Sequence, residues 1–184
     1  MSEKQREALI AECQRQYESC LYTAASLWIY QRSARRQKLF FIVAPIIFAA
    51  LAGSDILGYF GSGETGLALF FALLAGFFPS IYSALELGLR EKEIGRAAAD
   101  FTKLRDDFRQ LAHVHSHESF SDFFAKFERV KERKEFVRCD APNAPERFFK
   151  DAQAKINKGD YTFWVDDQRD PTLPDAVEDP RLEG

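Results

Sequence analysis

Two runs of apolar residues occupy the middle of the chain, with a short polar segment between them. The first run, LFFIVAPIIFAALAGSDILGYF, covers residues 39–60, and the second, LALFFALLAGFFPSIYSALEL, covers residues 67–87. Each is close to the roughly 20 apolar residues with which a helix crosses a bilayer. The connecting GSGETG, residues 61–66, is rich in helix-breaking residues and too short for anything but an antiparallel pair. The pattern predicts a two-span transmembrane hairpin.

A buried hairpin inside a soluble domain is the alternative interpretation. It would need the rest of the chain to cover two wholly apolar helices, yet the flanking residues are mostly amphipathic or charged. All 25 Lys and Arg residues lie in residues 1–38 or 90–184, so the positive charge stops at both ends of the apolar region. This distribution favours the membrane interpretation.

The polar flanks repeat apolar residues at heptad spacing, in steps of three and four or of seven. The pattern predicts that each spanning helix continues into the cytoplasm and that the two continuations pack as an antiparallel bundle. The principal predicted seam residues are Ile10, Tyr17 and Leu27 before the hairpin, and Ile94, Phe101, Leu104, Phe108 and Leu111 after it.

The expected fold is therefore an all-α membrane protein, a transmembrane hairpin whose long helices extend into a cytoplasmic helical bundle. Residues 1–38 are assigned to an N-terminal cytoplasmic helix and residues 88–164 to a cytoplasmic helical region. Within the latter, Ser119 is expected to cap a third amphipathic helix with KERKE on its polar face, and Pro145 to start a short helix that Gly159 ends. Residues 165–184 are acidic and proline-containing, which predicts a disordered tail.

Small residues recur at every fourth position of the second span. They are Ala68, Ala72, Gly76, Ser80 and Ala84, here called the small-residue stripe. Helices associate in lipid through close backbone approach, which small side chains allow. The stripe is expected to pack inside the hairpin, against Ala49, Ala52 and Gly53, in preference to a second protomer, which stays the alternative. Pro79 predicts a kink in this span.

The positive charges also predict orientation. Arg32, Arg35, Arg36 and Lys38 precede the first span, Arg90, Lys92 and Arg96 follow the second, and the connecting turn has no positive charge. The positive-inside rule then places both termini in the cytoplasm. The N-terminal segment has no apolar h-region, so no cleavable signal peptide is expected. The basic residues also suit anionic lipid headgroups, although fixing the topology explains them equally well.

Residues that carry chemistry are sparse. The sequence has no phosphate-binding glycine loop, zinc-protease motif or nucleophile elbow, so we expect no enzyme, cofactor or metal site. His113 and His117 would share a helix face, but His113, His115 and His117 sit where the heptads end and are interpreted as solvated turn residues without an assigned role. Cys13 and Cys20 are seven residues apart and are expected to pack as small apolar side chains.

The order of these elements resembles a known family. The segment YTAASLWIYQRSARRQKLFFIVAPIIFAALAG (residues 22–53), a short turn, LALFFALLAGFFPSIYSALEL and the charged REKEIGRAAADFTKLRDDFRQL resemble the SLATT family, the SMODS- and SLOG-associating two-transmembrane effector domains of prokaryotes. The resemblance covers roughly residues 8–160. It rests on the order of elements and on the pattern of residue types in the first segment rather than on a signature motif. It brings no catalytic residues.

The resemblance implies a membrane effector of a nucleotide-signalling or nucleotide-sensing defence system. Such a protein would sit in the bacterial inner membrane, form homo-oligomers, and make a pore or disrupt the membrane of an infected cell. Its expected partners are the lipid bilayer and a cytosolic nucleotide synthase or sensor protein of the same system, not nucleic acid. The alternative is a non-catalytic membrane-anchored scaffold that recruits a cytosolic partner through its helical bundle.

Overall fold

Helices make up almost the whole of the part that the computed structural model describes, residues 3–56 and 65–161. The elements are α1 (Glu3–Ile56), α2 (Thr65–Ala84), α3 (Leu87–His113), the short 3₁₀ helix η1 (His115–His117), α4 (Phe120–Asp140) and α5 (Glu146–Asn157). No strand occurs within these ranges, which confirms the all-α class. Most of the predicted turn at residues 61–66 and the predicted tail at residues 165–184 lie outside the described residues.

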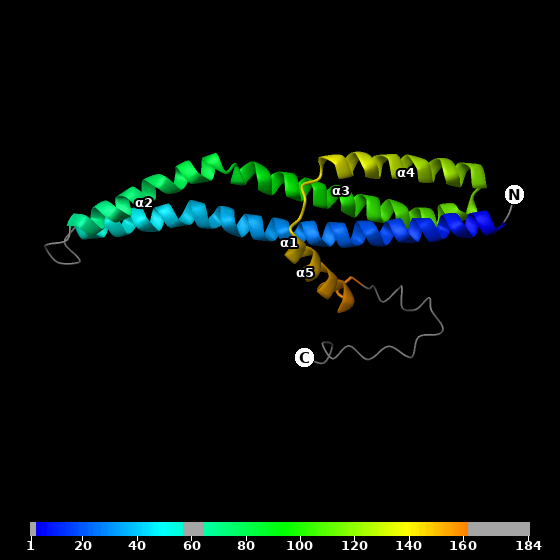
Figure 1. Ribbon diagram of the computed structural model, residues 1–184, viewed down its shortest axis with the longest axis horizontal. Helices are drawn as coiled ribbons and strands as arrows, with labels where there is room; N and C mark the ends of the chain where they lie inside the picture. Colours follow the sequence, from blue (N-terminus) through cyan, green and yellow to red (C-terminus); the bar gives the residue numbers. More distant parts are fainter. Residues whose placement is uncertain (1–2, 57–64, 162–184) are drawn as a thin grey trace.

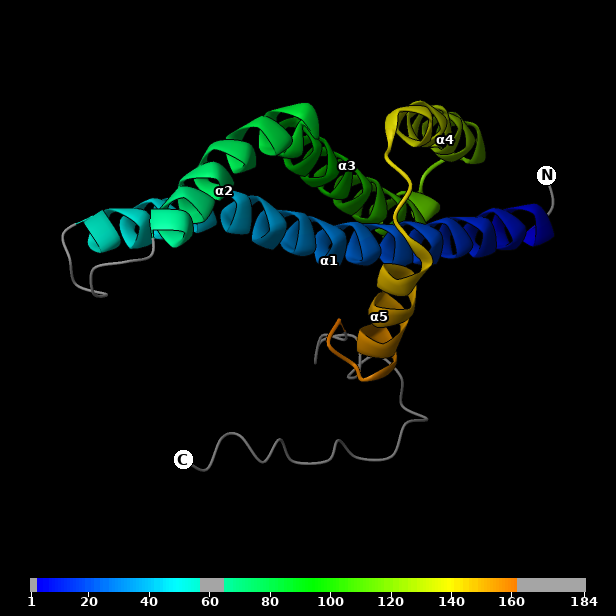
Figure 2. The same cartoon turned by 60° about the vertical axis from the view of Figure 1, so that its left-hand side comes forward.

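The helices are arranged around α1, which runs the full length of the molecule (Figure 1). α2 and then α3 return antiparallel along it, α4 folds back on α3, and α5 crosses α1 from the other side, as Figure 2 also shows. Pro45 lies inside α1 without ending it. The first apolar run is therefore continuous with the helix that precedes it, as predicted, while the cytoplasmic position of that helix stays a prediction.

The second span does not continue in the same way. α2 stops at Ala84, and the segments Leu69–Ala84 and Leu87–His117 meet at 41°. Glu86 has φ 48° and ψ 36°, which is the left-handed region. Its N–H donates to the carbonyl of Ser83 at 3.1 Å and its own carbonyl accepts from Arg90 N at 3.0 Å, so one helix ends and the next begins at this residue.

This break corrects one expectation, an uninterrupted second helix, whereas the kink predicted at Pro79 stays a prediction. Pro79 lies within α2 without ending it, because a proline inside a helix removes one hydrogen bond and need not stop the helix. The left-handed residue at Glu86 lies where the chain bends by 41° between α2 and α3. Gly88 follows the break closely, and a Cβ there would lie 2.7 Å from the Tyr82 hydroxyl, so a side chain at this position would require the Tyr82 ring to move.

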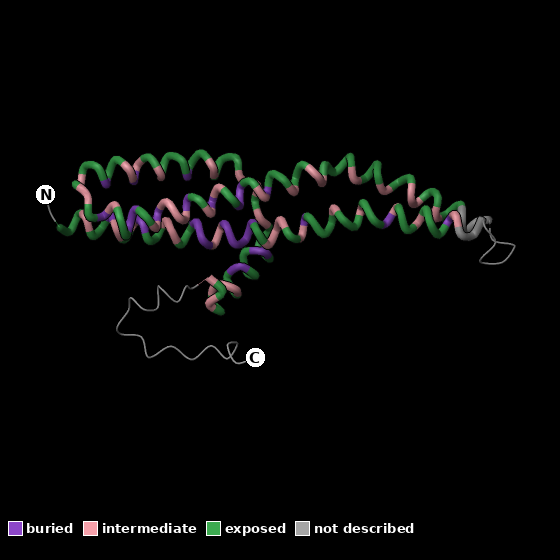
Figure 3. Tube along the Cα trace, turned by 180° about the vertical axis from the view of Figure 1, so that it is seen from behind, coloured by how far each residue is buried: buried purple, intermediate pink, exposed green. Residues whose placement is uncertain are grey.

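Burial is concentrated in the half of the molecule where α1 and α3 lie side by side (Figure 3). The main core cluster contains Leu27, Ile94, Phe101, Leu104, Phe108 and Leu111, with Ile10 and Tyr17 packed against it. α4 adds Phe123 and Phe127 to the same cluster, and the rings of Phe108 and Phe127 are 6.2 Å apart. The structure thus places all the predicted seam residues in or against one core.

The ends of the shorter helices follow local sequence signals. Ser119 caps α4, and its hydroxyl oxygen accepts a hydrogen bond from Asp122 N at 3.3 Å. Pro145 precedes α5, and Gly159 follows its end with φ 84°, a conformation that glycine adopts without strain. α5 is held to α1 by Phe148, whose ring stacks on Tyr30 at 5.0 Å. These caps confirm the predicted ends of α4 and α5.

Candidate functional site: the apolar hairpin

The apolar segments of α1 and α2 form the candidate site. α1 is long and apolar enough to cross a membrane, and α2 with α3 meets the same criteria only when the bent pair is taken as one span. The structure therefore contains one helix of this kind, or two with the bent pair. Only 11% of the residues in the most apolar part of α1 are buried. A core helix of a soluble protein would be mostly covered.

Large apolar side chains cover the outside of this hairpin. Those that are exposed are Leu39, Phe40, Ile42, Val43, Ile46, Ile47 and Leu51 on α1, and Leu69, Phe70, Leu73, Phe77, Ile81 and Leu85 on or just after α2. Residues 39–53 and 69–85 contain no charged residue. A continuous apolar surface of this extent on a polar protein marks a contact with a membrane or with another protein.

The contact between α1 and α2 is made by aromatic rings. The ring of Phe48 lies 5.9 Å from Phe71 and 5.5 Å from Phe78, and Phe41 lies 5.6 Å from Phe78. Ala44 and Ala52, one turn on either side of Phe48, are buried. The small residues of this contact therefore belong to α1, and the bulky ones come from both helices.

The small-residue stripe does not lie in this contact. Ala72, Gly76, Ser80 and Ala84 are all exposed, and a Cβ added at Gly76 would meet nothing within 4 Å. The side chain of Ala68 falls outside the described part of the chain. The expectation that the stripe packs inside the hairpin is therefore wrong for the four described positions.

The expected packing partners of the small-residue stripe on α1 are corrected as well. Ala49 is exposed and a Cβ at Gly53 would also meet nothing, whereas Ala52 faces inward. The physical reason is that Phe71, Leu74 and Phe78 occupy the opposite side of α2 and bury more apolar surface against α1 than small residues would. Residues at similar distances from a short turn lie at the same level of an antiparallel pair, which brings Phe78 near Phe48, but this signal does not determine which side of α2 faces α1.

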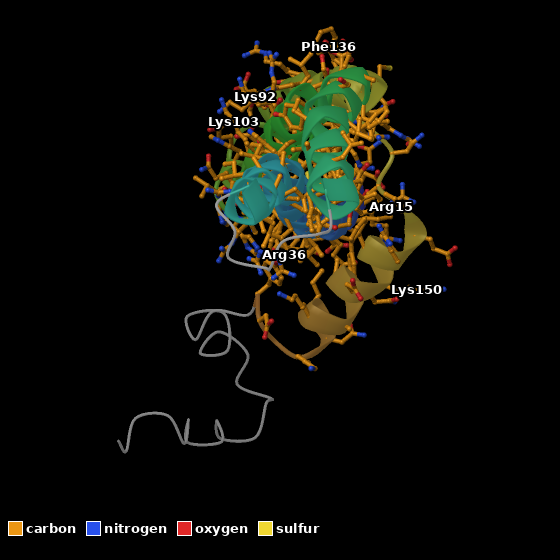
Figure 4. The ribbon with its side chains drawn as sticks, turned by 90° about the vertical axis from the view of Figure 1, so that its left-hand side faces the viewer. Arg15, Arg36, Lys92, Lys103, Phe136 and Lys150 are labelled. Atoms are coloured by element: carbon orange, nitrogen blue, oxygen red, sulfur yellow. The ribbon has the colours of Figure 1, made fainter. Side chains whose placement is uncertain are left out.

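Basic residues surround the base of the hairpin. Arg32, Arg35 and Arg36 are exposed on α1, and Arg90, Lys92 and Arg96 are exposed on the returning chain. Figure 4, seen from the hairpin end, shows Arg36 and Lys92 pointing away from the helices on different sides. Lys38 reaches across to Glu91 at 3.4 Å and links α1 to α3 at the border of the apolar region.

The three histidines do not share a helix face. His113 ends α3, whereas His115 and His117 belong to η1, with His113 and His117 exposed. His115 Nδ1 lies 2.8 Å from Glu118, which also accepts from Lys126 at 2.7 Å, and these two hydrogen bonds, Lys126 first, lower the pKa of Glu118. Among the residues that the structure describes, no group of three His, Cys, Asp or Glu side chains has the arrangement to hold a metal ion.

Comparisons with protein-family models, with curated proteins and with solved structures give no match for this chain.

Proposed function

We propose that the chain is a membrane effector whose hairpin inserts into the bacterial inner membrane with both termini in the cytoplasm. The observation that carries the proposal is the uncovered apolar surface of α1 and α2, which ends at a border of basic residues on α1 and α3. The resemblance to the SLATT family supports an effector role in a nucleotide-signalling or nucleotide-sensing defence system. In this role the protein opens a pore or disrupts the membrane.

Self-association is required because two helices cannot enclose a path for water. The outward-facing stripe supplies the surface for it. Ala72, Gly76 and Ser80 lie on the side of α2 away from α1, where no described residue of the same hairpin covers them. In lipid, a helix of a second protomer packs closely against such a surface because small side chains let the backbones approach.

The cytoplasmic bundle is the part that a partner reaches. A cytosolic synthase or sensor of the same system would act on α3, α4 or α5, since these elements lie beyond the basic border. α3 and α5 pack on α1, and α1 itself continues into the apolar segment.

A membrane-anchored scaffold is the second candidate function. The scarcity of polar side chains on the hairpin favours it, since Ser80 and Ser83 are the main exposed hydroxyl-bearing residues of α2 and offer little to line a water-filled path. A scaffold would use the hairpin only as an anchor and the bundle as its binding surface.

The experiment compares Gly76→Leu with Ala50→Leu in bacterial cells. Both variants place a leucine at an exposed position of the hairpin. Gly76 lies in the small-residue stripe of α2, whereas Ala50 lies on α1, outside the stripe. The parent and Ala50→Leu should arrest growth, admit a membrane-impermeant dye and give crosslinked oligomers. Gly76→Leu should lose all three, because the added bulk separates the helices of neighbouring protomers.

The monomer supplies the internal control. Gly76→Leu should unfold in detergent at a temperature no lower than that of the parent, because its new side chain meets nothing in its own chain and leucine favours a helix interior more than glycine does. A parent protein that is tolerated at high expression without dye uptake would contradict the effector and favour the scaffold. An unchanged Gly76→Leu phenotype would contradict the assigned surface.

A further inference from the structure

A cavity of about 350 Å³ lies in the cytoplasmic part of the molecule, where four helices meet. Its wall combines Ser19 and Leu27 of α1, Lys134 and Arg138 of α4, Asn143 of the segment that leads to α5, and Phe149 of α5, together with a few neighbours. Phe101 of α3 closes another side. No aspartate or glutamate lines it, so the charges that face the cavity are positive.

Lys134 is the unusual residue of this wall. It lies within the charged sequence KERKE, which was expected to face solvent, yet only 9% of it is exposed, whereas Lys131, Glu132, Arg133 and Glu135 are exposed. Its Nζ donates to Gln16 Oε1 and, at 3.2 Å, to Ser19 Oγ. Both acceptors are neutral, and no carboxylate of the described residues forms an ion pair with Lys134.

The other cations of α4 show the contrast. Lys126 pairs with Glu118, Lys131 with Glu128 and Arg133 with Asp107, at 2.7, 3.5 and 3.6 Å respectively. These pairs lie at or near the surface, where solvent would tolerate an unpaired charge. A buried ammonium without an anion is costly by comparison, since burial removes its hydration and two neutral oxygens replace only part of it.

The hydrogen-bond donors that remain converge on the cavity. A lysine ammonium has three N–H groups, and Lys134 uses two of them. The Ser19 hydroxyl accepts from Lys134 and so keeps its own O–H for a ligand. Arg138, one turn further along α4, also lines the cavity and forms no ion pair with a described residue. Thr23 and Ser26 are different, because their hydroxyls donate to carbonyls of α1.

We propose that this cavity binds a small soluble phosphate ester. Lys134, Arg138 and Ser19 would hold the phosphate, which needs several donors and positive charge. The organic part would lie on Leu27 and Phe149, the apolar part of the wall. The volume falls in the range of small-molecule sites, roughly 300 to 1,000 Å³.

A lipid headgroup carries the same phosphate chemistry but is out of reach. Ser19 precedes the start of the apolar run at Leu39 by twenty residues of continuous helix. At about 1.5 Å per residue, the cavity lies on the order of 30 Å from the membrane border. The proposal does not depend on the hairpin being an effector, because it rests on cytoplasmic residues alone.

Binding would add a link between α1, α4 and the segment that leads to α5. Asn143 lies in the connection between α4 and α5, which passes α1 in Figure 1. A phosphate held between α4 and α1 would therefore restrain this connection as well as the two helices.

The test uses the full chain in detergent, with phenyl phosphate as the probe and sodium chloride at equal ionic strength as the reference. Phenyl phosphate should raise the temperature of unfolding in proportion to the logarithm of its concentration above the dissociation constant. Lys134→Met should weaken binding at least tenfold. Lys131→Met, which removes the same charge from an exposed position of the same helix, should stay within twofold of the parent.

Arg138→Gln gives a second variant at an exposed position, in case Lys134→Met does not fold. It should also weaken binding at least tenfold. The proposal would be overturned if sodium chloride raised the temperature of unfolding as much as phenyl phosphate does. It would also be overturned if the Lys134 and Arg138 variants bound phenyl phosphate within twofold of the parent's affinity. Phosphatidylglycerol vesicles supply the lipid arm, and displacement of phenyl phosphate by them would overturn the assignment to a soluble ester. No measurement of membrane damage enters this test, so its failure is distinct from failure of the proposed function.

Discussion

Burial divides the three cysteines into two kinds. Cys13 and Cys20 are completely buried between α1 and its neighbours, as expected from their spacing, whereas Cys139 is exposed near the end of α4. Loss of hydration disfavours the thiolate and raises the pKa of each buried thiol to about 11. The charge of Glu12 raises the pKa of Cys13 further, whereas the nearby Lys134 partly opposes the effect of burial on Cys20.

These pKa values predict selective labelling. At pH 8 a thiol reagent should modify Cys139 and leave Cys13 and Cys20 unreacted, because thiolates are the reactive form and the buried thiols stay protonated. The measurement is the mass of the folded protein in mild detergent after labelling. Denaturation in dodecyl sulfate should bring the number of labels to three. Fast reaction of Cys13 or Cys20 in the folded protein would contradict the packing of α1.

At the residue scale, the regular spacing of apolar residues predicted which side chains of the amphipathic helices are buried, and a local signal predicted a helix cap. Phe101 and Phe108 repeat at seven and lie in the core, and Ser119 caps α4. Lys134 was not predicted, because a lysine among four charged neighbours has the ordinary pattern of a solvated face. Its burial depends on where α4 lies against Gln16 and Ser19 of α1, more than a hundred residues away in the sequence. Local patterns contain no information about that distance.

At the element scale, the break between α2 and α3 has a free-energy cost that the sequence pattern did not predict. A non-glycine residue in the left-handed region is less stable than glycine there by roughly 1 kcal/mol. Glu86 is the only described non-glycine residue with positive φ. The conformation persists because α3 packs along α1 on one side of the break and α2 packs on the aromatic rings of α1 on the other.

Replacement of Glu86 by glycine should therefore stabilise the protein. Glu86→Gly is expected to raise the midpoint of thermal unfolding in detergent by about 2–4 °C, which corresponds to roughly 1 kcal/mol. Glu93→Gly is the matched control, since Glu93 is also exposed but lies inside α3. It should lower the midpoint by a similar amount, because glycine weakens a helix interior. A loss of stability in both variants would show that the left-handed turn is not populated.

The rotation of α2 about its own axis was likewise beyond the sequence. A helix with a polar side has one orientation that buries its apolar side, and this is why the seam of α3 was predicted. α2 is apolar on all sides, so no boundary between polar and apolar residues fixes which side meets α1. The choice between Gly76 and Phe78 as the contact depends on the fit of the rings against Phe41 and Phe48.

At the scale of the whole molecule the proposed topology makes a direct prediction. In a Cys139→Ala background, Gly63→Cys should react with a membrane-impermeant maleimide in spheroplasts, because residue 63 lies between the two apolar runs. Ser2→Cys should react only after permeabilisation, because the basic border holds the N-terminus inside. Reaction of Ser2→Cys alone in intact spheroplasts would reverse the orientation, and equal reaction of both would exclude two spans.

The two sides of the hairpin differ in how they transmit movement. α1 is a single helix of 54 residues, about 80 Å long at 1.5 Å per residue, with the core of the bundle at one end and the apolar segment at the other. A rotation of its N-terminal end about the helix axis is carried to the apolar end, because the helix continues through Pro45, which removes only one of its backbone hydrogen bonds. The returning chain bends by 41° at Glu86, where the helical hydrogen-bond pattern is broken, so a change in the tilt of α2 would disturb fewer backbone hydrogen bonds than a bend within α1. A small rotation of the bundle would therefore turn a different side of the apolar segment of α1 toward its surroundings. The bend at Glu86 would absorb the accompanying change in the position of α2.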